Sequence, residues 1–323
     1  MRDTEYAYGV ARIRANEPML FSASDIQRLL SSADYADAMR IFAEKGWKMP
    51  ENSADFSAML ENESVKTWQL LTESVPDTGE IETLIVTNDF FNLKAALKAW
   101  AARKKAFDFF LRPAVTESSL IEEAVEKNEY GLLPDYLRSP AEQAYDAIVR
   151  LNNPGLADIA LDVAALNTKR RLSEKAGDTM LSEITSFFCA AANIKTAARC
   201  AKTGRDREYT VNTLCDSGMI DNDELAEAAL AGEERLAEYL SASFYEEAGE
   251  HLKRGLDAFE KWCDDTITQK VQAAKFTALG MSPIIAYFIH KEMEIKNARI
   301  ILSAKQNRLP ADIVRQRVRA VYV

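Results

Sequence analysis

The chain has 323 residues, enough for two or three domains with sizeable cores. Glycine and proline are scarce, at 12 and 9 residues, which favours helices and argues against β-sandwiches, β-barrels and glycine-rich nucleotide loops. The formal net charge of -10 argues against a general electrostatic attraction to nucleic acid and leaves room only for a local basic patch.

The predicted elements, in chain order, are short helices alternating with long ones. Short helices opened by polar residues are predicted at 24–30, 118–125 and 222–230. Long helices are predicted at 77–103, at 156–172 followed by 178–202, and at 247–278 followed by 282–308. Each stretch of about 100 residues therefore combines short helices with a long helix or hairpin. The corresponding domains are 1–112, 113–212 and 213–323, with boundaries near Arg112-Pro113 and within 205–222.

One short motif recurs three times and indicates an internal repeat. It is an asparagine followed two positions later by a basic residue, and its copies are Asn92 with Lys94, Asn193 with Lys195, and Asn297 with Arg299. Fifteen residues before each asparagine stands a residue suited to cap a helix, namely Asp77, Asp178 or Ser282. Glu80 would complete a capping box after Asp77, and Pro283 would occupy the first helical position after Ser282. Two landmarks at one fixed spacing predict three related helical units.

The motif itself predicts a buried asparagine on a closely packed helix face. Positions three, four and seven beyond each asparagine share its face and are mostly small and apolar, as in Ala95, Ala96 and Ala99. We expect the asparagine to be a buried polar contact that defines helix register. The basic residue two positions on points about 200° away, where it is either solvated or binds a partner.

Membrane spans and structural disulfides are not expected. The longest nearly apolar window, 280–289, is about half the length that a bilayer requires, and residues 1–5 lack the apolar core of a secretory signal. The four cysteines, Cys189, Cys200, Cys215 and Cys263, fit neither a disulfide-stapled small domain nor a C-x-x-C zinc site. A reducing cytoplasm is the expected compartment.

The search for catalytic motifs finds little. The sequence lacks the glycine-rich dinucleotide and phosphate-binding motifs and the H-E-x-x-H metal motif. His251 and His290 lack the glutamates of a di-iron bundle, and 202–204 resembles a β-lactamase element without the S-x-x-K that would supply a nucleophile. Asp264 and Asp265 are the best enzymatic candidate, as part of an Mg²⁺-diphosphate site, but the third carboxylate of such a site is missing. A solvated acidic face is the other interpretation. No cofactor or metal is expected.

Basic residues gather at the C-terminal end. Residues 291–323 carry eight basic and three acidic residues, and the arginines Arg315, Arg317 and Arg319 cluster in the last segment. Its apolar residues, Ile313, Val314, Val318 and Val321, suggest one side of a closing helix. The arginines either complement a helix C-terminus or dock to an acidic neighbour.

Three ordered motifs resemble the C subunit of V-type (archaeal A-type) ATP synthases, whose vacuolar counterpart is the d subunit. They are 6–15 (YAYGVARIRA) followed by 20–22, 89–94 (DFFNLK), and 291–299 (KEMEIKNAR) followed by 304–305 and 309–310. The resemblance runs from end to end. Departures are Pro18, where the family more often continues its first helix, Phe91, where a polar residue is common, and a shortened first hairpin.

The resemblance implies a funnel of three similar helical domains about a pseudo-threefold axis. It also implies a non-catalytic central-stalk subunit on the cytoplasmic face of the membrane, joining the rotor axle to the proteolipid ring during ATP-linked H⁺ or Na⁺ translocation. The family motifs add Tyr6, Tyr8, Arg12 and Arg14 to the candidate packing or interface positions. A free-standing helical-repeat scaffold and an all-α Mg²⁺-diphosphate enzyme are the alternatives.

Overall fold

The computed structural model describes residues 2–51, 55–104 and 109–321. Within these ranges every regular element is a helix and none is a strand, so the all-α prediction is confirmed. No helix in the described ranges is both long and apolar enough to cross a bilayer.

The chain divides into two compact units, which we describe separately. Unit 1 combines Met1–Thr78 with Arg254–Val323, and unit 2 is Gly79–Lys253. The predicted three-domain division, with ends at 112 and 212, is not tested by these contacts and stays a prediction.

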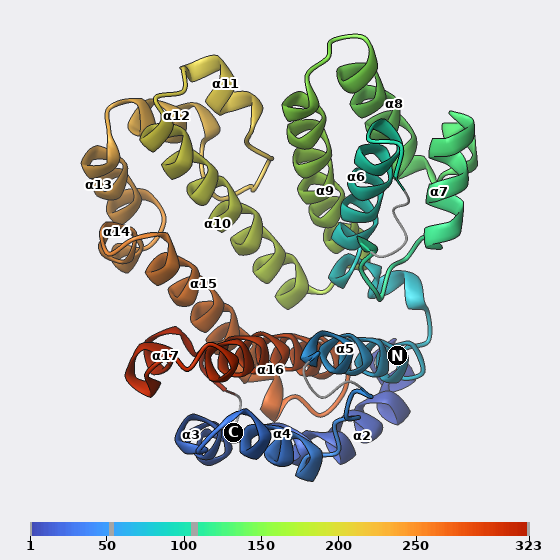
Figure 1. Ribbon diagram of the computed structural model, residues 1–323, viewed down its shortest axis with the longest axis vertical. Helices are drawn as coiled ribbons and strands as arrows, with labels where there is room; N and C mark the ends of the chain where they lie inside the picture. Colours follow the sequence, from blue (N-terminus) through green and yellow to red (C-terminus); the bar gives the residue numbers. More distant parts are fainter. Residues whose placement is uncertain (1, 52–54, 105–108, 322–323) are drawn as a thin grey trace. The chain divides into compact units, whose positions relative to one another are not determined.

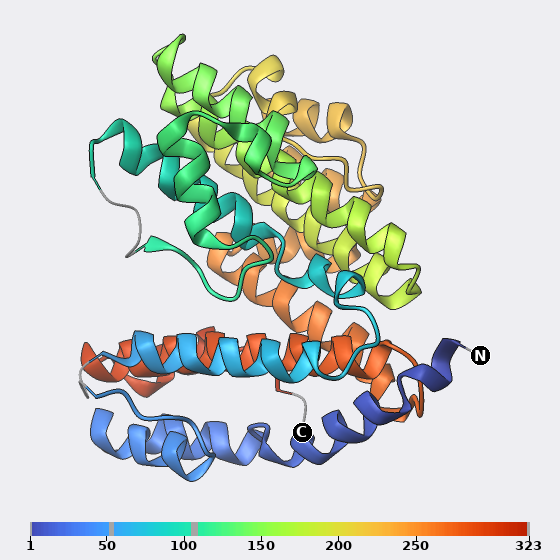
Figure 2. The same ribbon diagram turned by 90° about the vertical axis from the view of Figure 1, so that its right-hand side faces the viewer.

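Unit 1 is built around one long, almost completely buried helix. Its α-helices are α1 (Arg2–Glu5), α2 (Ala7–Asn16), α3 (Ala23–Ser31), α4 (Tyr35–Glu44), α5 (Phe56–Thr72), α15 (Leu256–Val271), α16 (Ser282–Gln306) and α17 (Ala311–Arg317), with 3₁₀ turns η1 (Glu17–Met19) and η6 (Gln272–Phe276). Figures 1 and 2 show α5 and α16 lying side by side, and α16 also contacts α2, α4, α15 and α17.

The sequence of α16 explains its central place. Its first two turns, from Pro283 to Phe288, are apolar on every side, so no orientation of the helix could leave them exposed at low cost. Ile295, Ala298 and Ile301 continue one core that includes aliphatic side chains of α3 and the aromatic residues Phe21 before α3, Phe42 on α4 and Trp47 after α4. Phe42 and Trp47 pack there with ring centroids 5.0 Å apart.

Unit 2 has a second core, centred on α6 and its neighbours. Its elements are η3 (Glu82–Leu84), α6 (Thr87–Ala101), α7 (Ser118–Lys127), η5 (Tyr130–Leu132), α8 (Asp135–Val149), α9 (Pro154–Ala176), α10 (Thr179–Thr203), α11 (Arg207–Asn212), α12 (Asn222–Leu230), α13 (Glu233–Ser243) and α14 (Glu246–Lys253). The 3₁₀ turn η2 (Thr78–Glu80) lies where the two units join in the chain. Helix α9 contacts α6, α8 and α10 (Figure 1). Small residues such as Ala141, Ala144 and Ala165 allow these helices to pack closely.

Most predicted helices are confirmed with small changes at their ends. The short helices at 24–30, 118–125 and 222–230 are contained in α3, α7 and α12, and the hairpin of 156–172 and 178–202 corresponds to α9 and α10. Asp178 caps α10 as predicted, since its side chain accepts from the Leu181 N–H. Helix α3 begins slightly earlier than predicted, because Ser22 and Asp25 form a capping box.

The predicted long helix at 77–103 is wrong in its first third. Helix α6 begins only at Thr87, with Val86 at its N-cap position, so Asp77 is not the N-cap of this helix. The intervening residues form two 3₁₀ turns instead. They bury Ile81, Leu84 and Ile85.

Two other predictions about helix ends need correction. The predicted helix at 247–278 is divided into α14, α15 and η6, and the first break lies at Gly255, whose φ of +110° is unsuited to a helix. Ser282 is already the first residue of α16, and the N-cap position belongs to Met281, which caps with no side-chain hydrogen bond. The closing helix α17 stops at Arg317, so Val318 and Val321 are not on a helical face.

Candidate functional site

Each of the three repeated asparagines is buried and holds a later stretch of backbone by the same two hydrogen bonds. In every case Nδ2 donates to the carbonyl of one residue and Oδ1 accepts from the N–H of that same residue. The pairs are Asn92 with Leu111 (3.1 and 2.6 Å), Asn193 with Cys215 (2.7 and 3.0 Å) and Asn297 with Arg319 (3.1 and 2.7 Å). We call this arrangement an asparagine clamp. The predicted burial of the three asparagines as polar contacts is confirmed.

The clamps satisfy backbone groups of segments that have no regular structure of their own. A buried N–H or C=O without a partner is costly, and the two ends of one side-chain amide match one backbone N–H and C=O. A second acceptor extends two of the clamps by one residue. Asn167 Oδ1 accepts from the Asp216 N–H at 3.0 Å, and Asp265 Oδ1 accepts from the Ala320 N–H at 2.7 Å. The similarity therefore extends beyond the motif itself.

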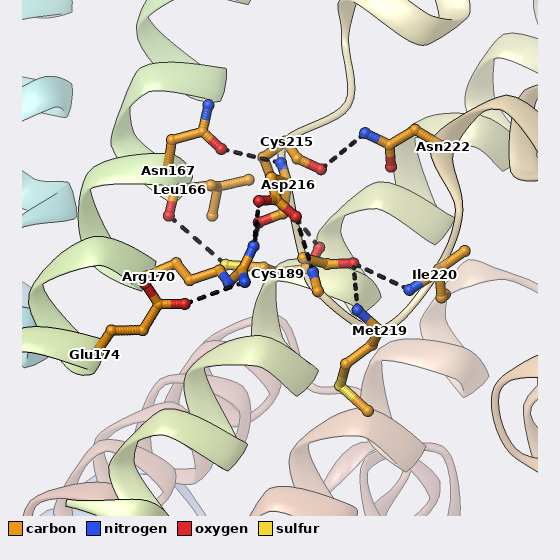
Figure 3. Close-up of polar contacts among 12 residues, drawn as sticks. Leu166, Asn167, Arg170, Glu174, Cys189, Cys215, Asp216, Met219, Ile220 and Asn222 are labelled. Atoms are coloured by element: carbon orange, nitrogen blue, oxygen red, sulfur yellow. Dashed lines mark hydrogen bonds and ion pairs between the residues drawn. The ribbon is translucent and has the colours of Figure 1, made fainter. Parts of the chain in front are cut away.

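Figure 3 shows the second clamped segment next to α9, whose residues Asn167, Arg170 and Glu174 are labelled at the left. Asn222 Nδ2 also donates to the Cys215 carbonyl, at 3.0 Å, so that carbonyl receives two side-chain donors. Arg170 forms ion pairs with both Asp216 and Glu174 across the outside of the segment. The segment is held to α9, α10 and α12 by polar contacts rather than by apolar packing alone.

Near the first clamp, an aspartate also accepts hydrogen bonds from the backbone that follows Leu111. Asp89, one helical turn before Asn92, accepts from the N–H groups of Val115 and Thr116 at 2.9 and 2.8 Å and from the Tyr136 hydroxyl at 2.7 Å. Burial raises the pKa of Asp89, and these hydrogen bonds oppose the rise. The Asp89 and Asn92 of the family-like DFFNLK motif thus act on the same downstream segment.

The three basic residues of the repeated motif lie in different surroundings. Lys94 forms ion pairs with Asp162, at 2.5 Å, and Asp158, at 4.0 Å, on α9. Lys195 is half-buried on α10, and Arg299 is exposed on α16. Lys94 therefore forms an intramolecular ion pair, whereas the side chain of Arg299 is exposed on the surface of α16.

The N-terminal motif packs α2 against the rest of unit 1. Tyr6 is buried, whereas Tyr8 is 70% exposed and lies under the Arg12 guanidinium, 5.7 Å from its ring centroid. Arg12 also pairs with Glu73 at 2.6 Å, just beyond the end of α5. Gly9 lies where α2 comes close to the backbone that follows α5. A side chain does not fit there, because a Cβ on Gly9 would lie 1.8 Å from the carbonyl oxygen of Ser74.

Arg14 ties the same helix to the connection between α15 and α16. Its guanidinium donates to the carbonyls of Ala274 and Thr277 at 2.8 and 2.9 Å and pairs with Glu17 at 2.5 Å. The Arg14 guanidinium therefore binds two backbone carbonyls that lie more than 250 residues further along the chain. Arg12 and Arg14 therefore have packing roles, and Tyr8 is the motif residue most accessible to a partner.

A buried charge cluster lies on α5 and α16, and sequence reasoning missed it. Lys291 Nζ contacts Glu63 Oε1 and Glu294 Oε2, each at 2.7 Å, and lies 5.1 Å from the Trp47 ring centroid. The other carboxylate oxygen of Glu294 accepts from the Phe21 N–H. Burial opposes the charge on Lys291, but the two carboxylates outweigh it and raise its pKa, while burial raises the pKa of Glu294. Charged residues inside an apolar helix were the available signal.

The C-terminal arginines do not form one common patch. Arg315 pairs with Asp312 at 2.9 Å and Arg317 with Asp257 at 2.9 Å, both on the surface. The Arg319 side chain is only 10% exposed and pairs with Asp264 at 2.9 Å. Arg319 is thus a structural residue of the third clamp.

Asp264, Asp265 and His290, considered above as candidates for catalysis or metal binding, lie in surroundings that suit a structural role. Asp264 accepts from Lys296 at 2.8 Å as well as from Arg319, and Asp265 pairs with Lys261 at 2.5 Å. Burial lowers the pKa of His290 to about 3. Across the described ranges no three His, Cys, Asp or Glu residues are grouped as metal ligands would be.

Comparison with known proteins gives consistent matches over nearly the whole chain. The family described as ATP synthase (C/AC39) subunit matches residues 9–317. The C subunit of the V-type sodium ATPase of Enterococcus hirae is 25% identical over 272 residues, covering 83% of each chain. The C subunit of the A-type ATP synthase of Thermococcus kodakarensis is 21% identical over 334 aligned positions, covering 97% of this chain and 90% of the relative.

Proposed function

Because the chain belongs to the ATP synthase (C/AC39) subunit family, we propose that it is a non-catalytic subunit of the central stalk of a rotary V/A-type ATPase. In this role it joins the rotor axle to the membrane proteolipid ring during ATP-linked movement of H⁺ or Na⁺, at the cytoplasmic face. The observation that carries the proposal is the family match over residues 9–317, which leaves little of the chain for an unrelated activity.

The three asparagine clamps support a threefold internal organisation. The proposed domains 1–112, 113–212 and 213–323 each contain one clamping asparagine, Asn92, Asn193 or Asn297. We infer that these domains are related by a pseudo-threefold axis in a funnel. A coupling subunit must transmit torque with little internal deformation, and close-packed helices joined by buried hydrogen bonds resist deformation.

The surroundings of Asp264 oppose the alternative of an Mg²⁺-diphosphate enzyme. A metal there would have to displace both Lys296 and Arg319 from the carboxylate. Breaking the Arg319 contact would also disturb the third clamp. A cation site with only two adjacent aspartates is poor in oxygen ligands even without these competitors.

The coupling role is tested in vesicles that contain the complete ATPase with or without this subunit. We expect loss of the subunit to leave ATP hydrolysis by the soluble head running while uptake of the transported ion, H⁺ or Na⁺, stops, and re-addition of the purified chain to restore uptake. Normal ion uptake per ATP hydrolysed without the subunit would refute the coupling role. That result is also what the free-standing scaffold alternative predicts.

Docking by the basic C-terminal arm is tested separately with its two exposed arginines. Arg319 is omitted, since its reversal would disturb the fold. The double variant Arg315→Glu/Arg317→Glu is compared with Arg40→Glu/Arg150→Glu, whose arginines are also exposed and paired within the chain. We expect the chain to assemble more weakly into the ATPase complex, and in a salt-sensitive manner, only in the Arg315→Glu/Arg317→Glu variant. The salt dependence is expected because exposed charges are screened over about 8 Å at physiological ionic strength. Equal assembly of both variants would show that the C-terminal arginines do not contribute to docking.

A further inference from the structure

A basic stretch lies at the C-terminal end of α10 and in the turn that follows it, although the chain as a whole is acidic. Residues 195–207 contain five basic residues and one acidic residue, whereas the formal net charge of the chain is -10. The acidic residue, Asp206, accepts from the Tyr209 N–H at 2.7 Å as the N-cap of α11. The stretch therefore concentrates positive charge on one part of unit 2.

Two arginines of this stretch line the same cavity. The cavity has a volume of about 240 Å³ and lies between α9, α10 and the segment that follows α10. Arg199 and Arg205 form part of its wall, together with the hydroxyl-bearing side chains of Thr196 and Tyr209. At about 30 Å³ for each molecule, this volume corresponds to about eight waters. Sites that enclose drug-sized ligands measure about 300–1,000 Å³, so this cavity suits a smaller group.

The positive charge of the two arginines is not neutralised within unit 2. Across the described residues, neither Arg199 nor Arg205 forms an ion pair or donates a side-chain hydrogen bond. Arg205 instead lies over the Tyr209 ring, with its guanidinium carbon 4.6 Å from the ring centroid, which restricts its position. The wall also contains Asp162, but a carboxylate oxygen of Asp162 lies 2.5 Å from Lys94 Nζ. The charge of Asp162 is therefore balanced by Lys94.

The C-terminal end of α10 does not account for the two arginines either. Basic side chains near a helix C-terminus can bind its last carbonyl groups. Here the Thr203 hydroxyl donates to the Arg199 carbonyl at 2.8 Å. The backbone N–H of Arg205 donates to the Cys200 carbonyl at 3.1 Å. Because a hydroxyl and a backbone N–H already satisfy these carbonyls, the guanidinium N–H groups of both arginines are available to a ligand.

The charge and the donors of this cavity match the chemistry of a phosphoryl group. A guanidinium presents five N–H donors in a planar fork, which can bind two phosphoryl oxygens at once. A phosphate group carries about 1.5–2 negative charges at pH 7, so one group balances both arginines. A carboxylate carries one charge and would leave one arginine without a partner. Thr196 adds a hydroxyl group to the same wall.

We propose that the cavity lined by Arg199, Arg205, Thr196 and Tyr209 binds one phosphoryl group. This group belongs either to inorganic phosphate or to the end of a nucleotide's phosphate chain, and both ligands offer the same oxygens to the arginines. The rest of a nucleotide is too large for the cavity and would lie outside it. The inference does not depend on the proposed coupling function, since it uses only contacts within unit 2.

Isothermal titration calorimetry of the complete chain with inorganic phosphate, ADP and acetate tests the site. Two hydrogen bonds to charged groups, each contributing a factor of about 10–100, predict that one phosphate binds per chain with a Kd of about 1 mM. Phosphate and ADP should compete. ADP binding that is at least about tenfold tighter would identify a nucleotide as the source of the phosphoryl group, and similar affinities would identify free phosphate.

Two results of these titrations would overturn the proposal. The first is saturable binding of neither phosphate nor ADP. The second is acetate binding as tight as phosphate binding, which would indicate a carboxylate site of the kind that an acidic peptide occupies.

Variants then locate the binding site. Arg199→Gln and Arg205→Gln should each weaken phosphate binding by about tenfold or more, because each loses hydrogen bonds to a charged group. The matched control is Arg171→Gln, which removes an exposed arginine of α9 that lies outside the cavity wall and also has no ion pair among the described residues. Circular dichroism checks the fold of each variant. Unchanged binding in Arg199→Gln and Arg205→Gln, or equal weakening in Arg171→Gln, would contradict the assignment to this cavity.

Discussion

Replacing Lys291 by methionine should destabilise unit 1 strongly and in a pH-dependent manner. The change keeps an unbranched side chain, one atom shorter, but removes the one ammonium that two buried carboxylates share, each at 2.7 Å. The Lys291 side chain is 4% exposed, and those of Glu63 and Glu294 are 6% and 4% exposed, so water cannot replace it. Removing one partner of a buried pair costs about 3–5 kcal/mol.

Protonation of Glu294 limits this loss and makes it depend on pH. Protonating a glutamate with an ordinary pKa of 4.5 costs about 4 kcal/mol at pH 7.5 and about 1.4 kcal/mol at pH 5.5, since each pH unit is worth about 1.4 kcal/mol. A carboxyl whose folded pKa is raised binds its proton more readily in the folded state, so its contribution to stability falls as pH rises. Lys291→Met should therefore regain about 2–3 kcal/mol between pH 7.5 and pH 5.5 through protonation of Glu294.

Urea unfolding followed by circular dichroism at both pH values measures the effect. The matched control is the triple variant Lys291→Met/Glu63→Gln/Glu294→Gln, which removes the orphaned charges together with their partner and should recover much of the stability at pH 7.5. The reasoning is refuted if Lys291→Met costs less than about 1 kcal/mol at pH 7.5, or if its cost is the same at the two pH values.

Three further predictions follow from single contacts. Gly9→Ala should lower stability by about 1–3 kcal/mol in thermal unfolding because its Cβ has no room, whereas Gly131→Ala, with open space around it, should not; equal melting temperatures would contradict the close approach. Asn297→Ala should cost about 1–3 kcal/mol and speed amide exchange at Arg319, whose N–H loses its acceptor; unchanged exchange would show that the clamp is dispensable. Burial opposes the charge on Asp25, but hydrogen bonds and a neighbouring lysine lower its pKa to about 2, so its stabilising effect is lost as pH falls from 4 to 2, and Asp25→Asn should flatten that part of the acid-unfolding curve.

The sequence by itself was enough for the features that depend on local pattern. Helical periodicity and scarce breakers predicted an all-α chain, and the hairpin of α9 and α10 was predicted within a few residues. The burial of Asn92, Asn193 and Asn297 followed from the small apolar residues on their helix faces. The motifs also indicated the family whose match covers residues 9–317.

Only the tertiary structure decided which groups meet. Local periodicity predicts that Asn297 is buried, but its partner at Arg319 depends on the path of the chain after α16. Lys291 likewise finds Glu63 across a separation that no sequence spacing encodes. The residues before α6 form 3₁₀ turns in which Ile81, Leu84 and Ile85 are buried, although the sequence pattern predicted a continuous helix there. The physical reason is common to all of these cases: propensity and capping act within one turn, whereas the cost of burying an unpaired charge, amide or apolar side chain is settled by whatever the rest of the chain brings beside it.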